Sequence, residues 1–258
     1  MHQHTNPPRP ATATKTTFRF NMRDTAITFD IETEALPFER VANMAPESIL
    51  VDKPDAATIE AYAEGLPSNW KPETRALKAQ EWSAGYSAED SQAEWMDDAA
   101  LDPSRARIYS YSAHQQGETI VRFADDIGGE AALIDEIVRM IGPGFAGPEV
   151  FTWNGIPFDL PFVRARCFYL KLKIPIWKRD ETWWDKRFRD LKREMAPKWD
   201  CPGYKQKSLD YFLRSIGRAP KIGSGKDFAS WDRAKQIEYA TEDVEGLYVL
   251  AERWTNRY

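Results

Sequence analysis

Cysteine is scarce in this chain, and long apolar runs are absent from it. The 258 residues include two cysteines, Cys167 and Cys201, whose spacing suggests neither a zinc site nor a disulfide framework, so we expect two reduced thiols. Residues 1–17 are polar and lack the apolar core of a signal peptide, and no later stretch approaches the length of a membrane span. We therefore expect a cytoplasmic protein.

The chain also lacks a net positive charge. Its formal net charge is -5 and its pI is about 5.4, which argues against a broad phosphate-binding surface such as that of a nucleic-acid coat protein. The charge is unevenly distributed. Residues 164–198 carry twelve basic and five acidic side chains, a net of +7, whereas residues 81–102 carry seven acidic and no basic ones. Any cationic surface is therefore expected to be local.

The composition is otherwise typical of a globular domain. Hydrophobic residues make up 42% of the chain and aromatic residues 13%, which is enough for a single core at this length. We expect a flexible tail over residues 1–17 and one domain over 18–258. A mostly polar insertion, 34–103, contains helical pieces near 56–64 and 74–82 that prolines interrupt, and we expect it to pack on the domain.

Strand and helix patterns alternate along the rest of the chain. Strands are expected at 18–30, 108–113, 119–123 and 149–153, with a hairpin at 115–118. Helices are expected at 133–141, after Pro157, within 177–199, at 208–216 and at the C-terminal end. Ser230 can cap the last helix, whose apolar seam comprises Ile237, Ala240, Val244, Leu247, Ala251 and Trp254. This order predicts an α/β fold with a mixed sheet and helices on its faces.

Residues 27–33 form an apolar, β-branched run that nevertheless carries two carboxylates. Successive side chains of a strand point to opposite faces, so Asp30 and Glu32 should lie on one side, about 7 Å apart along the backbone, and Phe29 and Ile31 on the other. Buried carboxylates on one face repel each other and lose solvation unless a cation lies between them. The pattern predicts a divalent-metal site; the alternative is a strand whose end has reached solvent.

Further candidate ligands follow later in the chain. Asp159 lies just past a predicted strand, in the opening turn of a helix, and Asp243 lies on the last helix one turn after Tyr239. Since sites in α/β sheets gather at strand ends beside chain crossovers, all four carboxylates are expected to converge. Singly, Asp159 could be a helix N-terminal charge, Tyr239 a core-edge aromatic and Asp243 a solvated acid. Oxygen ligands without His or Cys suit Mg²⁺ or Mn²⁺ better than Zn²⁺.

In order and context, these motifs resemble those of the DEDD 3′–5′ exonucleases, in the branch that bears a tyrosine. Phe29-Asp30-Ile31-Glu32-Thr33 matches the first motif, Asn154 with Asp159 the second, and Tyr239 with Asp243 the third. Within that family the chain is most similar to stand-alone exonucleases related to the proofreading domain of family B DNA polymerases, including phage and prophage forms. The resemblance covers roughly residues 25–254, and the insertion departs from it.

The resemblance implies a ribonuclease H-like, five-stranded mixed sheet and two divalent cations, Mg²⁺ or Mn²⁺, held by Asp30, Glu32, Asp159 and Asp243. One ion would activate the attacking water and the other would stabilise the leaving 3′-oxygen. Tyr239 would orient the water, because its ordinary pKa of about 10 makes it a poor base by itself. The implied activity releases nucleoside 5′-monophosphates from single-stranded 3′ ends, of DNA rather than RNA, in DNA repair or replication.

Substrate contacts are expected from residues in or near the motifs and from neighbouring cations, namely Ile31, Thr33, Asn154, Phe158, Arg164, Lys221 and Lys226. Cationic grooves and aromatic faces commonly hold single strands. The basic, Trp-containing segment 177–199 fits this role, although such a pattern is more often a solvated helix with aromatic anchors in the core, and Asn154 could simply cap a helix. Two other functions stay open: an exoribonuclease, and a non-catalytic nucleic-acid-binding or partner-docking module that retains the fold.

Overall fold

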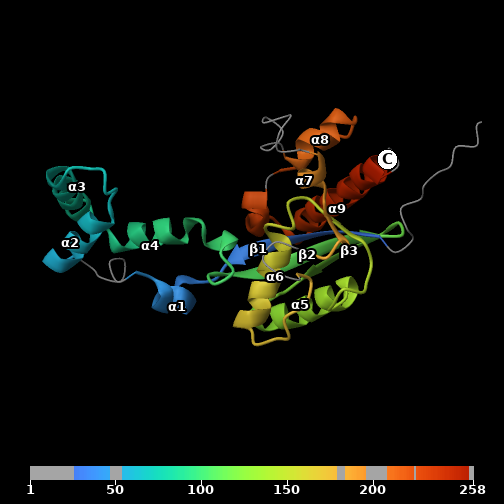
Figure 1. Cartoon of the computed structure of the whole chain (residues 1–258), viewed down its shortest axis with the longest axis horizontal. Coiled ribbons are helices and arrows are strands. Elements are labelled where there is room, and N and C mark those ends of the chain that lie inside the picture. The colour runs from blue at the N-terminus through green and yellow to red at the C-terminus, as the bar shows by residue number, and fades with distance from the viewer. Residues whose placement is uncertain (1–25, 47–53, 179–183, 196–207, 224, 256–258) are drawn as a thin grey trace, which may run out of the picture.

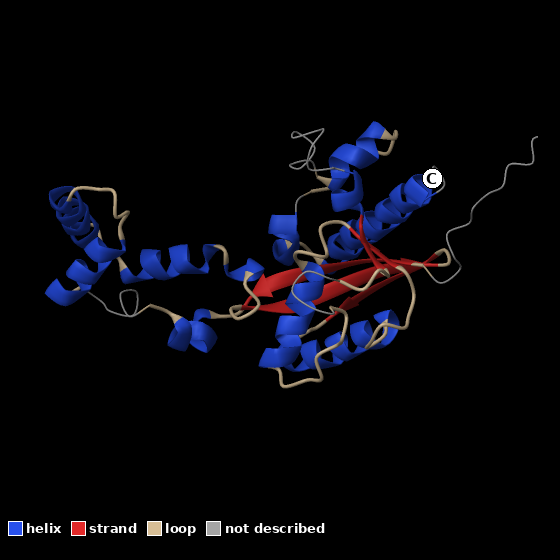
Figure 2. Ribbon diagram, viewed as in Figure 1, coloured by secondary structure: helices blue, strands red, loops and turns tan. Residues whose placement is uncertain are grey.

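A five-stranded mixed sheet forms the centre of the protein (Figures 1 and 2). The structure is a computed structural model that describes residues 26–46, 54–178, 184–195, 208–223 and 225–255; the expected tail at 1–17 and Cys201 lie outside these ranges. The strand order is β3-β2-β1-β4-β5. The strands are β1 (Ile27–Ala35), β2 (Ala106–Gln115), β3 (Glu118–Phe123), β4 (Val150–Thr152) and β5 (Phe188–Asp190).

The first three strands form an antiparallel meander, and β4 and β5 extend it in parallel beside β1. This arrangement confirms the predicted α/β class with a ribonuclease H-like sheet. The hairpin between β2 and β3 also lies where it is predicted. Its two turn residues, Gln116 and Gly117, have φ values of 54° and 82°, as a two-residue turn that follows the twist of the strands requires.

Helices cover both faces of the sheet. On one face, α5 (Ile127–Ile141) and α6 (Asp159–Tyr169) bury the odd-numbered β1 side chains Ile27, Phe29 and Ile31 in the largest core cluster. On the other face lie α8 (Leu209–Ser215) and α9 (Arg233–Thr255), and Figure 1 shows α5 and α9 on opposite sides of the sheet. The even-numbered β1 residues therefore face α9, and Thr28 donates a hydrogen bond of 2.8 Å to the carbonyl of Val244.

The long helix α9 begins later than predicted. Asp232, and not Ser230, caps it by accepting a hydrogen bond of 2.9 Å from the N–H of Lys235, because Ser230 ends a preceding 3₁₀ helix, Gly225–Ser230, and donates to the carbonyl of Asp227. The apolar seam is largely correct. Its first member is wrong, since Ile237 is 43% exposed and the neighbouring Gln236 turns inward instead.

The segment at 177–199 differs from the prediction as far as the structure describes it. It contains the three-residue strand β5 followed by the short helix α7 (Leu191–Met195), so only part of it is helical. A three-residue strand is too short to show a period, which explains why the sequence pattern did not reveal β5. The strand buries Phe188 and Asp190.

The insertion is helical and stands away from the sheet at its middle. The helices α2 (Ala56–Gly65) and α3 (Pro72–Ala84) lie where helices are expected, while α1 (Phe38–Val41) and α4 (Ala88–Asp97) are additional. Figure 1 shows α2 and α3 far from the sheet. The C-terminal end of the insertion packs on the domain: the hydroxyl of Thr33 donates a hydrogen bond to the carbonyl of Ala100, 2.6 Å away. Within the described ranges, no helix has the length and apolarity needed to cross a membrane.

Candidate metal centre

Three carboxylates from β1 and α9 meet on the sheet face that α9 covers. Asp30 and Glu32 are two residues apart on β1 and so share that face, while Asp243 comes from α9, where the helix crosses the strand. One oxygen of each lies within 4.8 Å of the others. Three hard oxygen donors at this separation fit a divalent cation such as Mg²⁺ or Mn²⁺. The cluster can therefore serve as a metal site.

Asp159 lies beside this cluster as a fourth carboxylate. It is the first residue of α6 and is buried, and its Oδ1 accepts a hydrogen bond of 3.2 Å from the backbone N–H of Ile31. That contact joins the start of α6 to β1 between the two strand carboxylates. The structure thus brings the four predicted acidic residues together, although the closest group consists of the other three.

Burial raises the pKa values of all four carboxyl groups, and the charges of neighbouring carboxylates in the cluster add to this at Asp30 and Glu32. Burial is the largest cause in each case; it raises the pKa of Glu32 to about 8 and that of Asp159 to about 7. The pKa of Asp30 lies well above its ordinary value, because burial is reinforced by the charges of Asp159, Glu32 and Asp243. Burial also raises the pKa of Asp243. Without a cation, the site therefore retains protons near neutral pH.

Lys221 supplies positive charge inside the cluster. Its Nζ lies 2.5 Å from Oδ1 of Asp243 and donates a hydrogen bond of 2.6 Å to Oδ2. The same ammonium donates to the hydroxyl of Tyr239 at 3.0 Å and lies 4.3 Å from the ring centroid. We predicted Lys221 as a substrate contact; the structure places it between the third-motif tyrosine and aspartate.

Tyr239 is buried one helical turn before Asp243, with its hydroxyl directed to the carboxylates. Burial, and then the charges of Asp243, Glu32 and Asp30, raise the pKa of this phenol above its ordinary value. The hydroxyl therefore remains protonated and can donate a hydrogen bond. A Cβ added at Gly225 would lie 3.4 Å from it and 3.5 Å from Oε2 of Glu32, so the absence of a side chain at Gly225 leaves room in the site.

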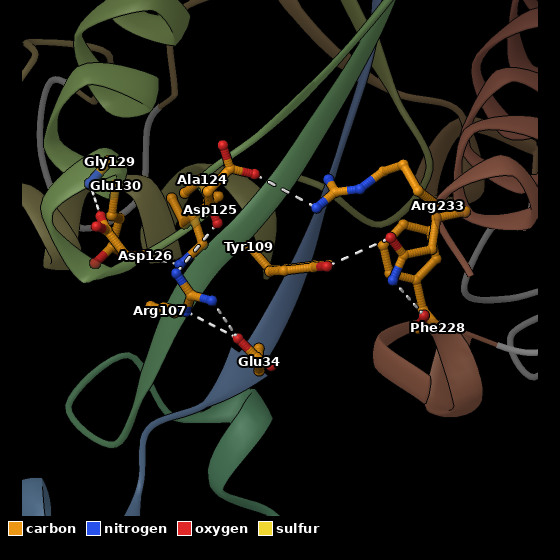
Figure 3. A network of polar contacts seen from close by, with 12 residues as sticks. Glu34, Arg107, Tyr109, Ala124, Asp125, Asp126, Gly129, Glu130, Phe228 and Arg233 are labelled. Carbon is orange, nitrogen blue, oxygen red and sulfur yellow. Dashed lines mark hydrogen bonds and ion pairs between the residues drawn. The ribbon is translucent and has the colours of Figure 1, made fainter. Parts of the chain in front are cut away.

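Aromatic and polar contacts fix the orientation of Tyr239. Its ring centroid lies 5.7 Å from that of Phe228 and 5.3 Å from that of Trp231. The carbonyl of Phe228 accepts a hydrogen bond of 2.9 Å from the side-chain amide of Gln236. The side-chain oxygen of Gln236 in turn accepts a hydrogen bond from the hydroxyl of Tyr109 (Figure 3). The same view shows Arg107 of β2 paired with Glu34 at the end of β1. The contacts of Gln236 with Tyr109 and Phe228 hold the start of α9 against the sheet.

A cleft of about 400 Å³ opens beside the carboxylates. Two of its lining residues, Asn154 and Lys221, are predicted substrate contacts, and two others, Trp153 and Lys192, add an aromatic face and a second cation. The full lining comprises Asp30, Trp153, Asn154, Lys192, Ser208, Leu209, Lys221, Asp243 and Leu247.

The other predicted substrate contacts do not line this cleft. Ile31 is buried in the core and contributes its backbone N–H to Asp159, and Thr33 bonds Ala100. Phe158 packs on Phe162, with ring centroids 5.5 Å apart. Arg164 is half-buried on α6, and Lys226 is exposed on the 3₁₀ helix.

Asp190 is a candidate site residue that the sequence analysis missed. This buried carboxylate, at the end of β5, accepts backbone hydrogen bonds from Asn154 at 3.1 Å, Ile156 at 3.3 Å and Arg193 at 3.3 Å. It thereby holds the loop between β4 and α6, in which Asn154 has a φ of 69°. A local sequence pattern could not reveal this role of Asp190, because the two loop residues that it binds are far from it in the chain. Asn154 is 36 residues away and Ile156 is 34 residues away.

The fold and the site define an α/β protein with a ribonuclease H-like sheet and an acidic candidate metal centre. No protein-family model matches the chain, and no curated protein does either. Among solved structures, it is similar to a family B DNA polymerase from the hyperthermophilic archaeon Pyrobaculum calidifontis, with 15% sequence identity and a TM-score of 0.49. The match covers 88% of this chain and 24% of that chain, so this chain spans about a quarter of the polymerase's length. A likeness of this degree carries no conclusion about function.

Proposed function

We propose that the protein is a metal-dependent 3′–5′ exonuclease that removes nucleoside 5′-monophosphates from single-stranded 3′ ends, of DNA in preference to RNA. The observation that carries the proposal is the approach of Asp30, Glu32 and Asp243 to within 4.8 Å, with Asp159 and Tyr239 beside them. These five residues are the acidic and tyrosine positions of the three sequence motifs. We further propose that residues 18–258 form the exonuclease domain, with 34–103 inserted in it.

Each carboxylate has a distinct place in the proposed site. Asp30 is central, since the charges of the other three act on it, and it would be one of the residues that hold the cations. Glu32 and Asp243 belong to the closest group, where Lys221 pairs with Asp243, while Asp159 is tied to the N–H of Ile31. When bound, Mg²⁺ or Mn²⁺ would promote deprotonation of the attacking water and stabilise the charge on the leaving oxygen.

Tyr239 orients the attacking water in this proposal. Because its pKa is raised, the phenol is a hydrogen-bond donor and not a general base. The contacts with Phe228 and Trp231 hold the ring in place, and the ammonium of Lys221 holds the hydroxyl. The geometry therefore favours positioning over proton abstraction.

The cleft provides the substrate side of the site. Lys192 and Lys221 offer positive charge to a phosphate, Trp153 offers a stacking face, and Asn154 offers polar groups beside Asp30. Single strands are commonly held by cations and aromatic faces in this combination.

Degradation of a 5′-labelled single strand tests the proposed function. With Mg²⁺ or Mn²⁺, the wild type should yield a ladder that shortens from the 3′ end, whereas cleavage from the 5′ end would release the label at once. Asp30→Ala should lower the rate by at least about 10³-fold, since it removes the central ligand. Asp97→Ala, which changes an exposed aspartate of α4, is the matched control. An inert wild type with both metals, or an Asp30→Ala variant as fast as the wild type, contradicts the proposal; RNA of the same sequence tests the preference.

Tyr239→Phe tests the role of the phenol. The variant keeps the ring packing and the four carboxylates, so it should bind metal as the wild type does and lower the rate by about 10- to 100-fold. Mn²⁺ affinity and single-turnover rates would be measured on the same preparation. A fall in metal affinity would mean that Tyr239 supports the metal site and does not position water.

A further inference from the structure

The middle of the insertion consists of helices that have almost no core. The helices α2, α3 and α4 contain 33 residues, and Ala79 is the single buried one among them. The hairpin of α2 and α3 relies on an aromatic stack in which the ring centroids of Tyr62 and Trp82 lie 4.2 Å apart. Trp70 and Leu77 remain 39% and 55% exposed. Short helices gain most of their stability from packing. We therefore expect this region, residues 55–98, to pack against a partner surface. We call this region the acidic arm.

The charge of the acidic arm indicates what it can bind. It carries ten acidic and three basic side chains, a net of -7, and all ten acidic side chains are exposed. A nucleic acid would be repelled by this surface. A basic protein surface with exposed apolar side chains would complement both its charge and its apolar residues.

The same chain carries such a surface elsewhere. The segment Phe168–Ile176, at and beyond the end of α6, exposes four large apolar side chains together with Lys171 and Lys173. The apolar side chains are Phe168, Tyr169, Ile174 and Ile176, with Phe168 at 67% and Ile176 at 56% exposure. We call this segment the basic ledge. Six of the eleven large apolar side chains that are exposed in the described part of the chain lie on the acidic arm, residues 55–98, or on the ledge, which is more than isolated exposed residues account for.

The arm and the ledge are separated within one molecule. Figure 1 shows α2 and α3 projecting to one end, away from α6. We propose that the acidic arm of one copy docks on the basic ledge of a second copy, and the reverse, in a two-fold dimer. This reciprocal pairing covers both surfaces at once and doubles the contact area of a single arm, as closed two-fold symmetry does. The interface is distinct from the candidate metal centre.

Sedimentation equilibrium on the full chain tests the dimer. Over about 1 to 100 μM, a range that covers moderate and weak protein association, the wild type should reach twice 29.7 kDa. The ledge variant Lys171→Glu/Lys173→Glu and the arm variant Glu60→Lys/Glu64→Lys should each weaken the dimer at least tenfold. The wild-type dimer should also weaken with added salt.

Charge exchange provides the specific readout. An equimolar mixture of the two variants should restore the dimer, because each arm then meets a ledge of opposite charge. The control Arg218→Glu/Arg253→Glu changes two other exposed basic residues and should leave the mass unchanged. Thermal melting by circular dichroism establishes that each variant folds. A wild type of 29.7 kDa throughout, or folded reversal variants that stay dimeric, or a mixture that stays monomeric, would overturn the proposal.

Discussion

Replacing Glu32 by glutamine should stabilise the protein at alkaline pH when a chelator keeps it metal-free. Burial, and then the charge of Asp243, raise the pKa of Glu32 from 4.5 to about 8. A carboxyl group with a raised pKa favours the folded state only while it is protonated. The free energy of unfolding of the metal-free wild type should therefore fall as the pH rises from about 4.5, the ordinary pKa of Glu32, through about 8, its pKa in the folded protein. Glutamine has no charge to lose and keeps nearly the same shape.

The size of the effect follows from the two pKa values. The difference between 4.5 and about 8 sets an upper limit of about 5 kcal/mol on the cost of ionising Glu32 in the folded state. Glu32 is only partly shielded from solvent, so screening should reduce the observed gain to about 2 to 3 kcal/mol at pH 9. Near pH 4 the two proteins should be equally stable.

Urea denaturation at pH 4, 6 and 9 in excess chelator measures this difference. Glu118→Gln, at an exposed position on β3 of the same sheet, is the matched control and should change stability by less than about 0.5 kcal/mol. With Mg²⁺ in place of chelator the order should reverse, because the wild type gains more from binding the ion. If Glu32→Gln is no more stable than the wild type at pH 9 in chelator, the electrostatic reasoning is wrong.

Three further substitutions test single contacts of the site. Lys221→Met removes the cation that is paired with Asp243 and should tighten Mn²⁺ binding by about tenfold, measured by titration calorimetry; weaker binding would contradict the expected competition. Asp190→Asn replaces a carboxylate that accepts three backbone hydrogen bonds and should cost about 1 to 3 kcal/mol in urea denaturation. Gly155→Ala should cost a similar amount, because a Cβ there would lie 2.5 Å from Cβ of Thr152; an unchanged midpoint for either of the last two would mean that the loop is not held as described.

The acidic part of the site was predictable because it depends on short-range periodicity. The two-residue spacing of Asp30 and Glu32 places them on one face of a strand, and the four-residue spacing of Tyr239 and Asp243 places those on one side of a helix. The convergence of the two pairs was predicted from a family resemblance and from the general location of sites in α/β sheets. The structure brings them together because α9 crosses β1 on the face that carries the even-numbered residues.

The remaining features depend on contacts between distant parts of the chain. Asp190 stabilises a loop more than thirty residues earlier in the chain, and Lys221 meets Asp243 across 22 residues. Local patterns show neither pairing. The position of the insertion was also beyond prediction, since whether a polar helix packs on a sheet depends on a complementary surface that its own sequence does not reveal.

Binding of a divalent cation to this site should release protons, and the number should fall as pH rises. Near pH 7 the metal-free protein holds a proton on Glu32 most of the time and on Asp159 about half of the time, given pKa values of about 8 and 7, and Asp30 is also protonated more often than an ordinary aspartate. Metal ligands must be deprotonated, so binding at pH 7 should release at least about one proton from Glu32 and Asp159 together.

Titration calorimetry with Mg²⁺ in two buffers of different ionisation enthalpy counts these protons. At pH 9 the release should be about one proton smaller than at pH 7, because Glu32 and Asp159 are then largely ionised before the metal binds. The Glu32→Gln variant should release about one proton fewer than the wild type at pH 7 if it still binds. An equal release at pH 7 and pH 9 in the wild type would contradict the raised pKa values. The cost of burying four carboxylates would then have to be offset by Lys221 alone, a single positive charge among four negative ones.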